Sequence, residues 1–185
     1  MIVSAHDGYP RHVSSGADFI ELDIRRTPEG VIVLAHDPIK SGKRYVTFEE
    51  VLARTPSNVG LHLDLKEKGF EVELLERALT HPLVVTPDFL ESAHNIKQAF
   101  PHVRVSPIDF VTLDQAKANE QTLNVAEPIW IWTVDDELLM ELFMKDKSVE
   151  AIITNRPGLA LTLRSARSGC PSGSRTRPGR ASSGG

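Results

Sequence analysis

The segment GADFIELDIRRTPEGVIVLAHDP, residues 16–38, carries the strongest fold signal in the chain. Its first apolar run, Phe19–Ile24, is rich in Ile and Leu and has the length of a β-strand. Successive side chains of a strand point to opposite faces, so Glu21, Asp23 and Arg25 share one face and the aliphatic residues share the other. The sequence therefore predicts a strand with one charged face and one apolar face.

Similar short apolar runs occur on both sides of this segment. We predict eight strands, at Ile2–Ala5, Phe19–Ile24, Val31–His36, Val59–Lys66, Leu83–Thr86, Val103–Pro107, Ile129–Val134 and Ala151–Thr154. Helical patterns occur at Thr47–Ala53, Phe70–Leu79, Phe89–Phe100, Leu113–Asn119 and Glu137–Lys145. Alternating strands and helices indicate an α/β fold with a parallel sheet, and eight strands favour a compact, closed (β/α)8 TIM barrel. The connection at Thr27–Gly30 is too short for a helical crossover, so one unit of the barrel should be irregular.

The composition is that of one globular domain. The chain has 185 residues, of which 41% are hydrophobic and 25% charged, and its single cysteine, Cys170, cannot form an internal disulfide. Apolar stretches of membrane-spanning length are missing, and the first residues do not resemble a signal peptide. We therefore expect a cytoplasmic protein with no integral membrane segment; its oligomeric state stays open.

Charge is unevenly distributed along the chain. Residues 164–185 hold five arginines and no acidic residue, and their Gly, Ser and Pro content predicts a disordered basic tail. Residues 1–163, the predicted domain, keep 16 basic and 25 acidic residues, a formal charge of −9. An acidic body argues against nucleic acid as a partner, because a phosphate backbone needs a positive surface.

A second predicted strand repeats the division between a charged face and an apolar face. In Leu61–Lys66, the side chains of His62, Asp64 and Lys66 share one face and three leucines the other. If helices cover the apolar faces, the carboxylates enter the barrel, where like charges are costly without a counter-ion. We therefore predict a divalent cation held by Glu21, Asp23 and Asp64, and oxygen ligands select Mg²⁺ or Ca²⁺. The alternative is that both strands are half exposed, with polar residues on a surface.

Two histidines follow apolar runs, where barrel enzymes carry catalytic groups. His6 ends the first predicted strand and His36 the third. Two imidazoles beside carboxylates suit acid–base catalysis around an anion, because one ring accepts a proton while the other donates one. We predict that His6 and His36 form this acid–base pair.

The motifs, taken together, resemble those of glycerophosphodiester phosphodiesterases. Residues 16–38 are similar to the central signature of that family, and residues 4–8 to its opening Ala-His-Arg-Gly. Residues 63–66 resemble its third-ligand strand, residues 132–135 its seventh-strand motif, and residues 152–157 its closing Thr-Asp-x-Pro. The resemblance covers residues 2 to about 163 and implies a (β/α)8 barrel that hydrolyses a small glycerophosphodiester with a divalent metal.

The resemblance also implies roles for individual residues. His6 and His36 would be the acid–base pair, Glu21, Asp23 and Asp64 the metal ligands, and Lys66 a phosphate contact. Trp132 would line the pocket and stack on the alcohol part of the substrate, including a choline-type cation.

Some features of the sequence depart from that family pattern. Asp7 stands where the family has an arginine, so a charge that would attract the phosphate is replaced by one that repels it. The first crossover and the loop after His36 are short. Arg25, or a basic turn with Lys40, Lys43 and Arg44, could take over the phosphate contact.

Two other functions remain open. Asp64 in place of the family glutamate resembles spider-toxin-type phospholipases D, which suggests a lyase that forms a cyclic phosphate. Asp7 and the short loops suggest instead a degenerate barrel that binds a phosphodiester or a protein partner without turning over a substrate.

Overall fold

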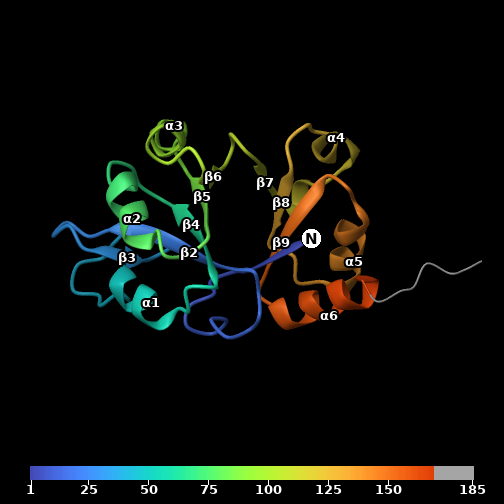
Figure 1. Cartoon of the computed structure of the whole chain (residues 1–185), viewed down its shortest axis with the longest axis horizontal. Helices are drawn as coiled ribbons and strands as arrows, with labels where there is room; N and C mark the ends of the chain where they lie inside the picture. The colour runs from blue at the N-terminus through green and yellow to red at the C-terminus, as the bar shows by residue number, and fades with distance from the viewer. Residues whose placement is uncertain (169–185) are drawn as a thin grey trace, which may run out of the picture.

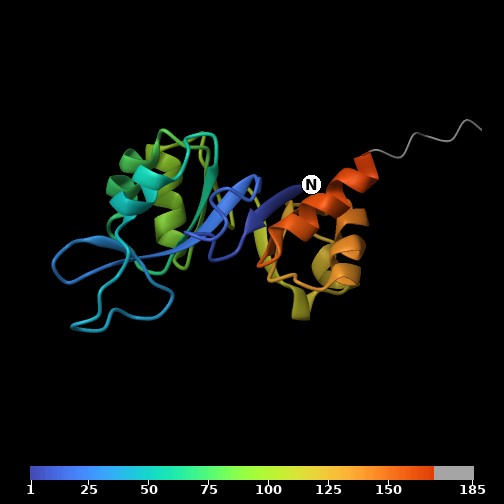
Figure 2. The ribbon, with the colours of Figure 1, turned by 90° about the horizontal axis from the view of Figure 1, so that it is seen from below.

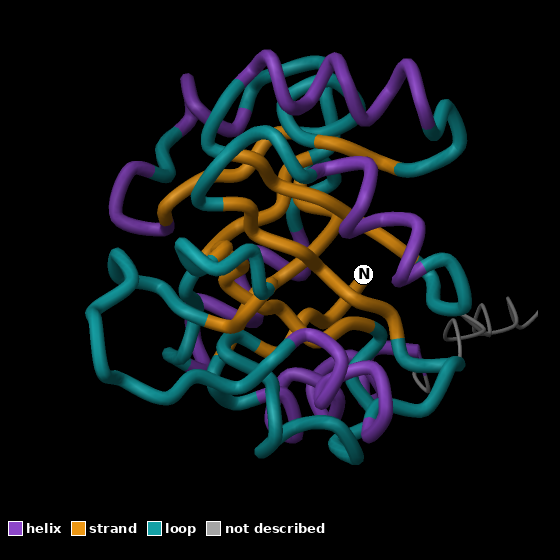
Figure 3. Tube along the Cα trace, turned by 90° about the vertical axis from the view of Figure 1, so that its left-hand side faces the viewer, coloured by secondary structure: helices purple, strands orange, loops and turns teal. Residues whose placement is uncertain are grey.

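The computed structural model describes residues 1–168, which form a curled sheet with helices packed around it (Figures 1 and 3). The strands are β1 Ile2–Ala5, β2 Phe19–Arg26, β3 Ile32–Leu34, β4 Gly60–Leu65, β5 Leu83–Pro87, β6 Arg104–Val105, β7 Val111–Asp114, β8 Ile129–Trp132 and β9 Val149–Thr154. The helices are α1 Phe48–Arg54, α2 Glu71–Ala78, α3 Leu90–Ala99, the 3₁₀ turn η1 Gln115–Lys117, α4 Glu120–Leu123, α5 Glu137–Lys145 and α6 Pro157–Ser168.

The parallel strands follow the order β6-β5-β4-β2-β1-β9-β8-β7, which is the neighbour order of a (β/α)8 barrel. Two groups of helices cover the outside: α1, α2 and α3 lie beside β2 to β6, and α4, α5 and α6 beside β7 to β9 (Figures 1 and 2). Within residues 1–168, no helix has the length and apolar character needed to cross a bilayer.

The barrel is not closed by hydrogen bonds, which corrects the predicted closed barrel. Strands β6 and β7 end the sheet on its two sides, and no ladder joins them within residues 1–168. Strand β6 has two residues, and only residues 106–110 connect it to β7. A parallel crossover normally needs about a dozen residues, so this connection is too short to bring the two strands side by side.

Two predicted elements have different structures. The run at Val31–His36 forms β3, which pairs antiparallel with β2 as a hairpin, so it is not a barrel strand. The eighth parallel strand is β7, which overlaps the first two residues of the helix predicted at Leu113–Asn119; the following residues, 115–117, form the 3₁₀ turn η1. The short turn at Thr27–Gly30 explains the hairpin, because it reverses the chain but cannot cross over. The first crossover, residues 6–18, contains turns and no helix, which agrees with the predicted shortening.

Helix α6 extends past the predicted end of the domain. It ends at Ser168, so Arg164 and Arg167 belong to a helix and not to the predicted tail. Arg164 forms an ion pair with Asp18, and Asp18 also accepts a hydrogen bond from the backbone of Val3. Through Asp18, which precedes β2, these contacts link α6 to β1. The rest of the predicted tail, residues 169–185, lies outside the described residues.

Apolar side chains pack on both sides of the sheet. The larger core joins the outer faces of the strands to the helices and includes Leu22, Leu63 and Leu74. A smaller core inside the barrel includes Trp130 and Phe110, whose ring centroids are 5.0 Å apart. This packing turns the charged faces of β2 and β4 inward, as the alternation predicts.

Candidate active site

A cavity of about 310 Å³ opens at the carboxyl ends of the parallel strands. All the side chains of the predicted metal and acid–base sets line it. The lining residues are His6, Glu21, Asp23, His36, His62, Asp64, Lys66, Thr86, Asp88, Thr112, Trp132 and Ile153. The two predicted sets, which come from four separate segments of the sequence, therefore share one cavity.

The three predicted metal ligands lie close together. Strands β2 and β4 are paired in register, with Asp23 opposite Asp64 and Glu21 opposite His62. One carboxylate oxygen from each of Glu21, Asp23 and Asp64 lies within 4.8 Å of the other two. The surface interpretation of this polar face is therefore wrong, because Glu21 is only 4% exposed.

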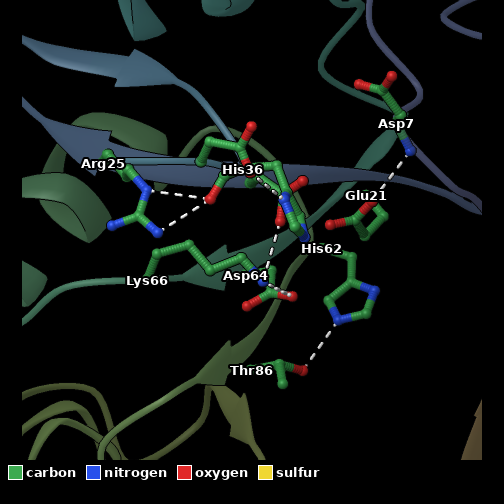
Figure 4. Close-up of polar contacts among 10 residues, drawn as sticks. Asp7, Glu21, Arg25, His36, His62, Asp64, Lys66 and Thr86 are labelled. Carbon is green, nitrogen blue, oxygen red and sulfur yellow. Dashed lines mark hydrogen bonds and ion pairs between the residues drawn. The ribbon is translucent and has the colours of Figure 1, made fainter. Parts of the chain in front are cut away.

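Lys66 lies beside two of these carboxylates. Its Nζ is 2.7 Å from Asp64 Oδ2 and 3.0 Å from Asp23 Oδ1 (Figure 4). Burial lowers the pKa of Lys66, but the two carboxylates outweigh burial and hold this pKa above its usual value. The ammonium group is therefore charged and neutralises part of the acidic cluster. We call Glu21, Asp23, Asp64 and Lys66 the mouth cluster.

The carboxylates of the mouth cluster are not fully compensated by Lys66. Burial and the neighbouring Asp23 raise the pKa of Glu21 to about 8, although the backbone N–H of Asp7 donates to Glu21 Oε2 at 2.9 Å. Burial raises the pKa of Asp64 to about 6, and the buried Asp64 Oδ1 has no hydrogen-bond partner. Three converging oxygens with an unpartnered buried atom fit a hard divalent cation.

His6 is oriented by a chain of hydrogen bonds from the loops after β8 and β9. Its Nδ1 is 3.0 Å from Asn155 Oδ1, and Asn155 Nδ2 donates to Asp135 Oδ2 at 2.7 Å. Burial would raise the pKa of Asp135, but hydrogen bonds from Asn155 and Thr154 hold it below its usual value. An ionised Asp135 can only accept, so the Asn155 amide is fixed with its oxygen toward His6.

The orientation of Asn155 decides the tautomer of His6. Because an amide oxygen only accepts hydrogen bonds, His6 Nδ1 must be the protonated ring nitrogen. In the neutral ring, Nε2 then carries a lone pair that can take up a proton. Sequence reasoning included Thr154 and Asn155 in a motif but gave them no role.

His36 lies on the exposed loop after β3, and its side chain is 76% exposed. Its Nδ1 is 3.1 Å from Asp37 Oδ1, and this hydrogen bond is the largest cause that lowers the pKa of Asp37. The two histidines thus have different partners: an amide for His6 and a carboxylate for His36.

Arg25 has a different position from the one that we predicted. It does not line the cavity; Nε and Nη2 donate to the backbone oxygen of His36 at 3.1 and 2.9 Å, and Nη1 pairs with Glu67 Oε1 at 3.0 Å. Figure 4 shows the guanidinium directed at the His36 carbonyl. Alternation along β2 put Arg25 on the charged face, but the fold uses it to hold the His36 loop instead of the substrate.

Asp7 contributes through its backbone. Its φ of 46° lies in the left-handed region, which asparagine and aspartate tolerate better than most residues. This turn aims the Asp7 N–H at Glu21, while its carboxylate points away from the mouth cluster (Figure 4). The next residue must be glycine, because a Cβ at Gly8 would lie 2.7 Å from the Cβ of Ile20. Because the Asp7 carboxylate points away from the mouth cluster, it should repel the substrate phosphate less than the sequence suggests.

His62 is a site residue to which sequence reasoning gave no role. Its Nε2 is 2.9 Å from Thr86 Oγ1, and its ring contacts Trp130 edge to face at 5.1 Å between centroids. Burial is the largest cause that lowers the pKa of His62 to about 3, so the ring is neutral. Its alternation with Asp64 and Lys66 was the signal that could have identified it.

The remaining predicted substrate contacts are Trp132 and the lysines of the basic turn. Trp132 lines the cavity and is 42% exposed, so its ring is available at the rim. Lys40 and Lys43 do not line this cavity, and they belong to a separate hollow that shares His36 with it.

Comparisons with known proteins bear on the fold. No protein-family model matches the chain, and no curated protein matches it. Among solved structures, a glycerophosphodiester phosphodiesterase from Parabacteroides distasonis is 19% identical, with a TM-score of 0.72 over 90% of this chain and 98% of that one. The enzyme of that name from Thermotoga maritima is 17% identical, with a TM-score of 0.71 over 89% and 98%.

A third solved structure holds a ligand. A phosphodiesterase from Oleispira antarctica, in complex with the product sn-glycerol-3-phosphate, is 16% identical with a TM-score of 0.68, over 89% of this chain and 97% of that one. The chain therefore has the fold of the glycerophosphodiester phosphodiesterases.

Proposed function

We propose that this protein hydrolyses a glycerophosphodiester to an alcohol and glycerol 3-phosphate with the help of a divalent cation. The observation that carries the proposal is the convergence of three carboxylates, a lysine and two differently partnered histidines on one cavity. The likeness to a phosphodiesterase that binds sn-glycerol-3-phosphate supports this substrate class.

Glu21, Asp23 and Asp64 are the residues that would hold the cation, Mg²⁺ or Ca²⁺. When bound, such an ion neutralises nonbridging phosphate oxygens and charge that develops in the transition state. Its positive charge would also offset the cost of burial, the largest cause that raises the pKa values of Glu21 and Asp64.

Lys66 is the proposed direct contact to the phosphate. It is held at the carboxyl end of β4 by Asp23 and Asp64, so its position does not depend on the substrate. A preorganised ammonium group stabilises the additional charge of the transition state without a cost of reorganisation. Trp132, at the rim, would form an apolar wall for the alcohol part of the substrate.

The partners of the two histidines divide the proton transfers. His6 Nε2 would take the proton from the attacking water as its oxygen bonds to phosphorus, because Asn155 keeps the other nitrogen protonated. His36, oriented by its contact with Asp37, would act as the acid and give a proton to the alcohol oxygen as the phosphorus–oxygen bond breaks. Arg25 positions His36 through its backbone oxygen.

The test is to titrate the purified protein with Mg²⁺ or Ca²⁺ on a panel of glycerophosphodiesters and to follow the products by ³¹P NMR. We expect glycerol 3-phosphate that depends on the cation. A cyclic phosphate would indicate the lyase reaction, in which a substrate hydroxyl replaces water. Lack of turnover on every diester, with diester binding retained, would support the noncatalytic barrel.

A further inference from the structure

A second hollow adjoins the catalytic cavity on the side of His36. It has a volume of about 190 Å³ and is formed by the loop between β3 and α1. Its lining residues are Leu34, Ala35, His36, Asp37, Pro38, Lys40, Lys43 and Tyr45. We call it the loop hollow. Because His36 lines both spaces, the loop hollow lies directly beside the catalytic cavity.

The loop around this hollow is fixed by contacts at its base and across it. At its base, the backbone N–H of Leu34 donates to Val46 O at 2.9 Å, and Val33 and Thr47 form an antiparallel bridge. Across the hollow, the backbone N–H of Lys40 donates to Tyr45 Oη at 2.9 Å. The loop is therefore an ordered wall on one side of the hollow.

The hollow carries two ammonium groups. Lys40 and Lys43 are exposed, and within residues 1–168 neither forms an ion pair with a carboxylate. The Nζ of Lys43 lies 5.0 Å from the centroid of the Tyr45 ring, and both side chains line the hollow. One carboxylate, that of Asp37, also lines the hollow, and it is bonded to His36. The loop hollow therefore has an excess of positive charge in a protein whose net charge is negative.

We propose that the loop hollow binds an anionic group, a carboxylate or a second phosphate, on the alcohol part of the diester. This inference rests on the proposed function, in which His36 protonates the departing alcohol and so places that alcohol next to the hollow. Lys40 and Lys43 would then attract a negative group on the alcohol and disfavour an ammonium group. The preferred substrate is therefore not a choline or ethanolamine diester, in contrast to the expectation drawn from Trp132.

The experiment compares diesters that differ in one charge. Glycerol phosphodiesters of 3-hydroxypropanoate, 3-hydroxypropanamide and 3-aminopropanol have similar size and carry an anionic, a neutral and a cationic group. A fourth diester, of propane-1,3-diol monophosphate, replaces the carboxylate with a phosphate. We expect kcat/KM to be about tenfold higher for the carboxylate than for the amide at low salt, from two exposed charge pairs. The ratio should fall toward one in 0.5 M NaCl, because screening acts on exposed charges.

Variants of the loop separate the hollow from the general charge of the protein. The double variant Lys40→Gln/Lys43→Gln should bring the carboxylate-to-amide ratio near one, and Lys40→Glu/Lys43→Glu should favour the amine. The control Arg44→Gln is compared with the single variants Lys40→Gln and Lys43→Gln: each of the three removes one positive charge from the same loop, but Arg44 does not line the hollow. Arg44→Gln should leave the ratio close to the wild-type value.

The outcomes distinguish the inference from the proposed function. Two results would overturn the inference and leave the proposed hydrolysis intact. One is turnover of the amide diester with a carboxylate-to-amide ratio of kcat/KM near one, and the other is a ratio that the double variant leaves unchanged. A carboxylate-to-amide ratio that falls as far in Arg44→Gln as in Lys40→Gln or Lys43→Gln would assign the preference to overall charge and reject the hollow. Lack of turnover on all four diesters would refute the proposed function itself.

Discussion

Two glutamates inside the barrel, Glu150 near its floor and Glu21 near its mouth, have pKa shifts of opposite sign. Burial would raise the pKa of Glu150, but hydrogen bonds from Arg104 and Trp130 hold it below its usual value. Arg104 donates to both carboxylate oxygens at 3.0 and 2.7 Å, and Trp130 Nε1 donates at 2.8 Å. Glu21 accepts one backbone hydrogen bond, and burial with Asp23 raises its pKa to about 8.

The opposite pKa shifts indicate that the two groups of residues have different roles, one structural and one in binding. The floor cluster, Arg104, Glu150 and Trp130, links β6, β8 and β9, and its charges are matched by hydrogen bonds. It therefore stabilises the side of the barrel where β6 and β7 are not joined. The mouth cluster has three carboxylates and one ammonium group, so it keeps an unfavourable charge that a cation can neutralise. Completed hydrogen bonding indicates a structural role, and incomplete compensation indicates a binding site.

The largest expected effect is on catalysis at the mouth. We expect His6→Ala and His36→Ala each to lower kcat/KM for a glycerophosphodiester by roughly 10²–10⁴, because each removes one proton transfer. The thermal midpoint of His36→Ala should change little, since His36 is mostly exposed. The measurement is steady-state kinetics, with circular dichroism as the check of folding. The control is Glu150→Gln, which should keep most of the activity; a larger loss of activity in that variant than in His36→Ala would contradict the division between the clusters.

The second effect is the pH dependence of stability without cation. The pKa of Glu21 is about 8 in the folded protein and about 4.5 when unfolded, so the folded state binds this proton more tightly. The resulting stability is full below pH 4.5 and is lost as the pH rises to 8. Compared with Glu21→Gln, the wild type should lose about 3 kcal/mol between pH 5.5 and 8.5.

Urea unfolding at the two pH values measures this loss. Saturating Mg²⁺ or Ca²⁺ should reverse it in the wild type and not in Glu21→Gln, because the cation binds the folded state alone. Equal cation effects in both proteins would show that Glu21 is not part of the cation site. Glu150 should give the opposite pH trend: its stabilisation is present above the unfolded pKa near 4.5 and is lost as the pH falls.

A smaller effect is expected at the floor. Arg104→Met should reduce the free energy of unfolding by about 1–2 kcal/mol at pH 7, because it leaves Glu150 with only the Trp130 hydrogen bond. Both side chains of the pair are about one third exposed, at 34% and 32%, and solvent limits the loss. Urea unfolding gives the stability, and kcat should stay within about twofold of the wild type. A neutral effect on stability would show that the open side of the barrel does not depend on this pair.

The smallest effect tests whether position or hydrogen bonding decides the role of a residue. Arg25 lies on the charged face of β2 near the mouth, yet its hydrogen bonds are completed by His36 and Glu67, as at the floor. Arg25→Lys should lower kcat by about three- to tenfold with little change in KM, since a lysine cannot hold the His36 carbonyl with two donors. Arg26→Lys, at the neighbouring residue, is the control. An increase in KM with unchanged kcat would mean that Arg25 binds substrate.

Much of the mouth could be predicted from the sequence, for a local reason. Alternation in β2 and β4 fixes which side chains share a face, so it placed Glu21, Asp23 and Asp64 together before the strands were paired. The same local rule failed for Arg25, because alternation gives the face of a side chain and not the group that it contacts. Local patterns also could not give the direction of β3. Its apolar run predicts a strand, but the composition is the same whether that strand is parallel or antiparallel to β2.

The sequence by itself determined the alternating elements, the inward carboxylates and the positions of the two histidines, because strand periodicity and the ends of apolar runs are local properties. The tertiary structure decided the open side between β6 and β7, the extension of α6 to Ser168, and the different partners of His6 and His36. The contact between His6 and Asn155 joins residues 149 positions apart, and the Arg104–Glu150 pair joins residues 46 positions apart. Contacts over such separations depend on how the strands are ordered, and no local pattern encodes them.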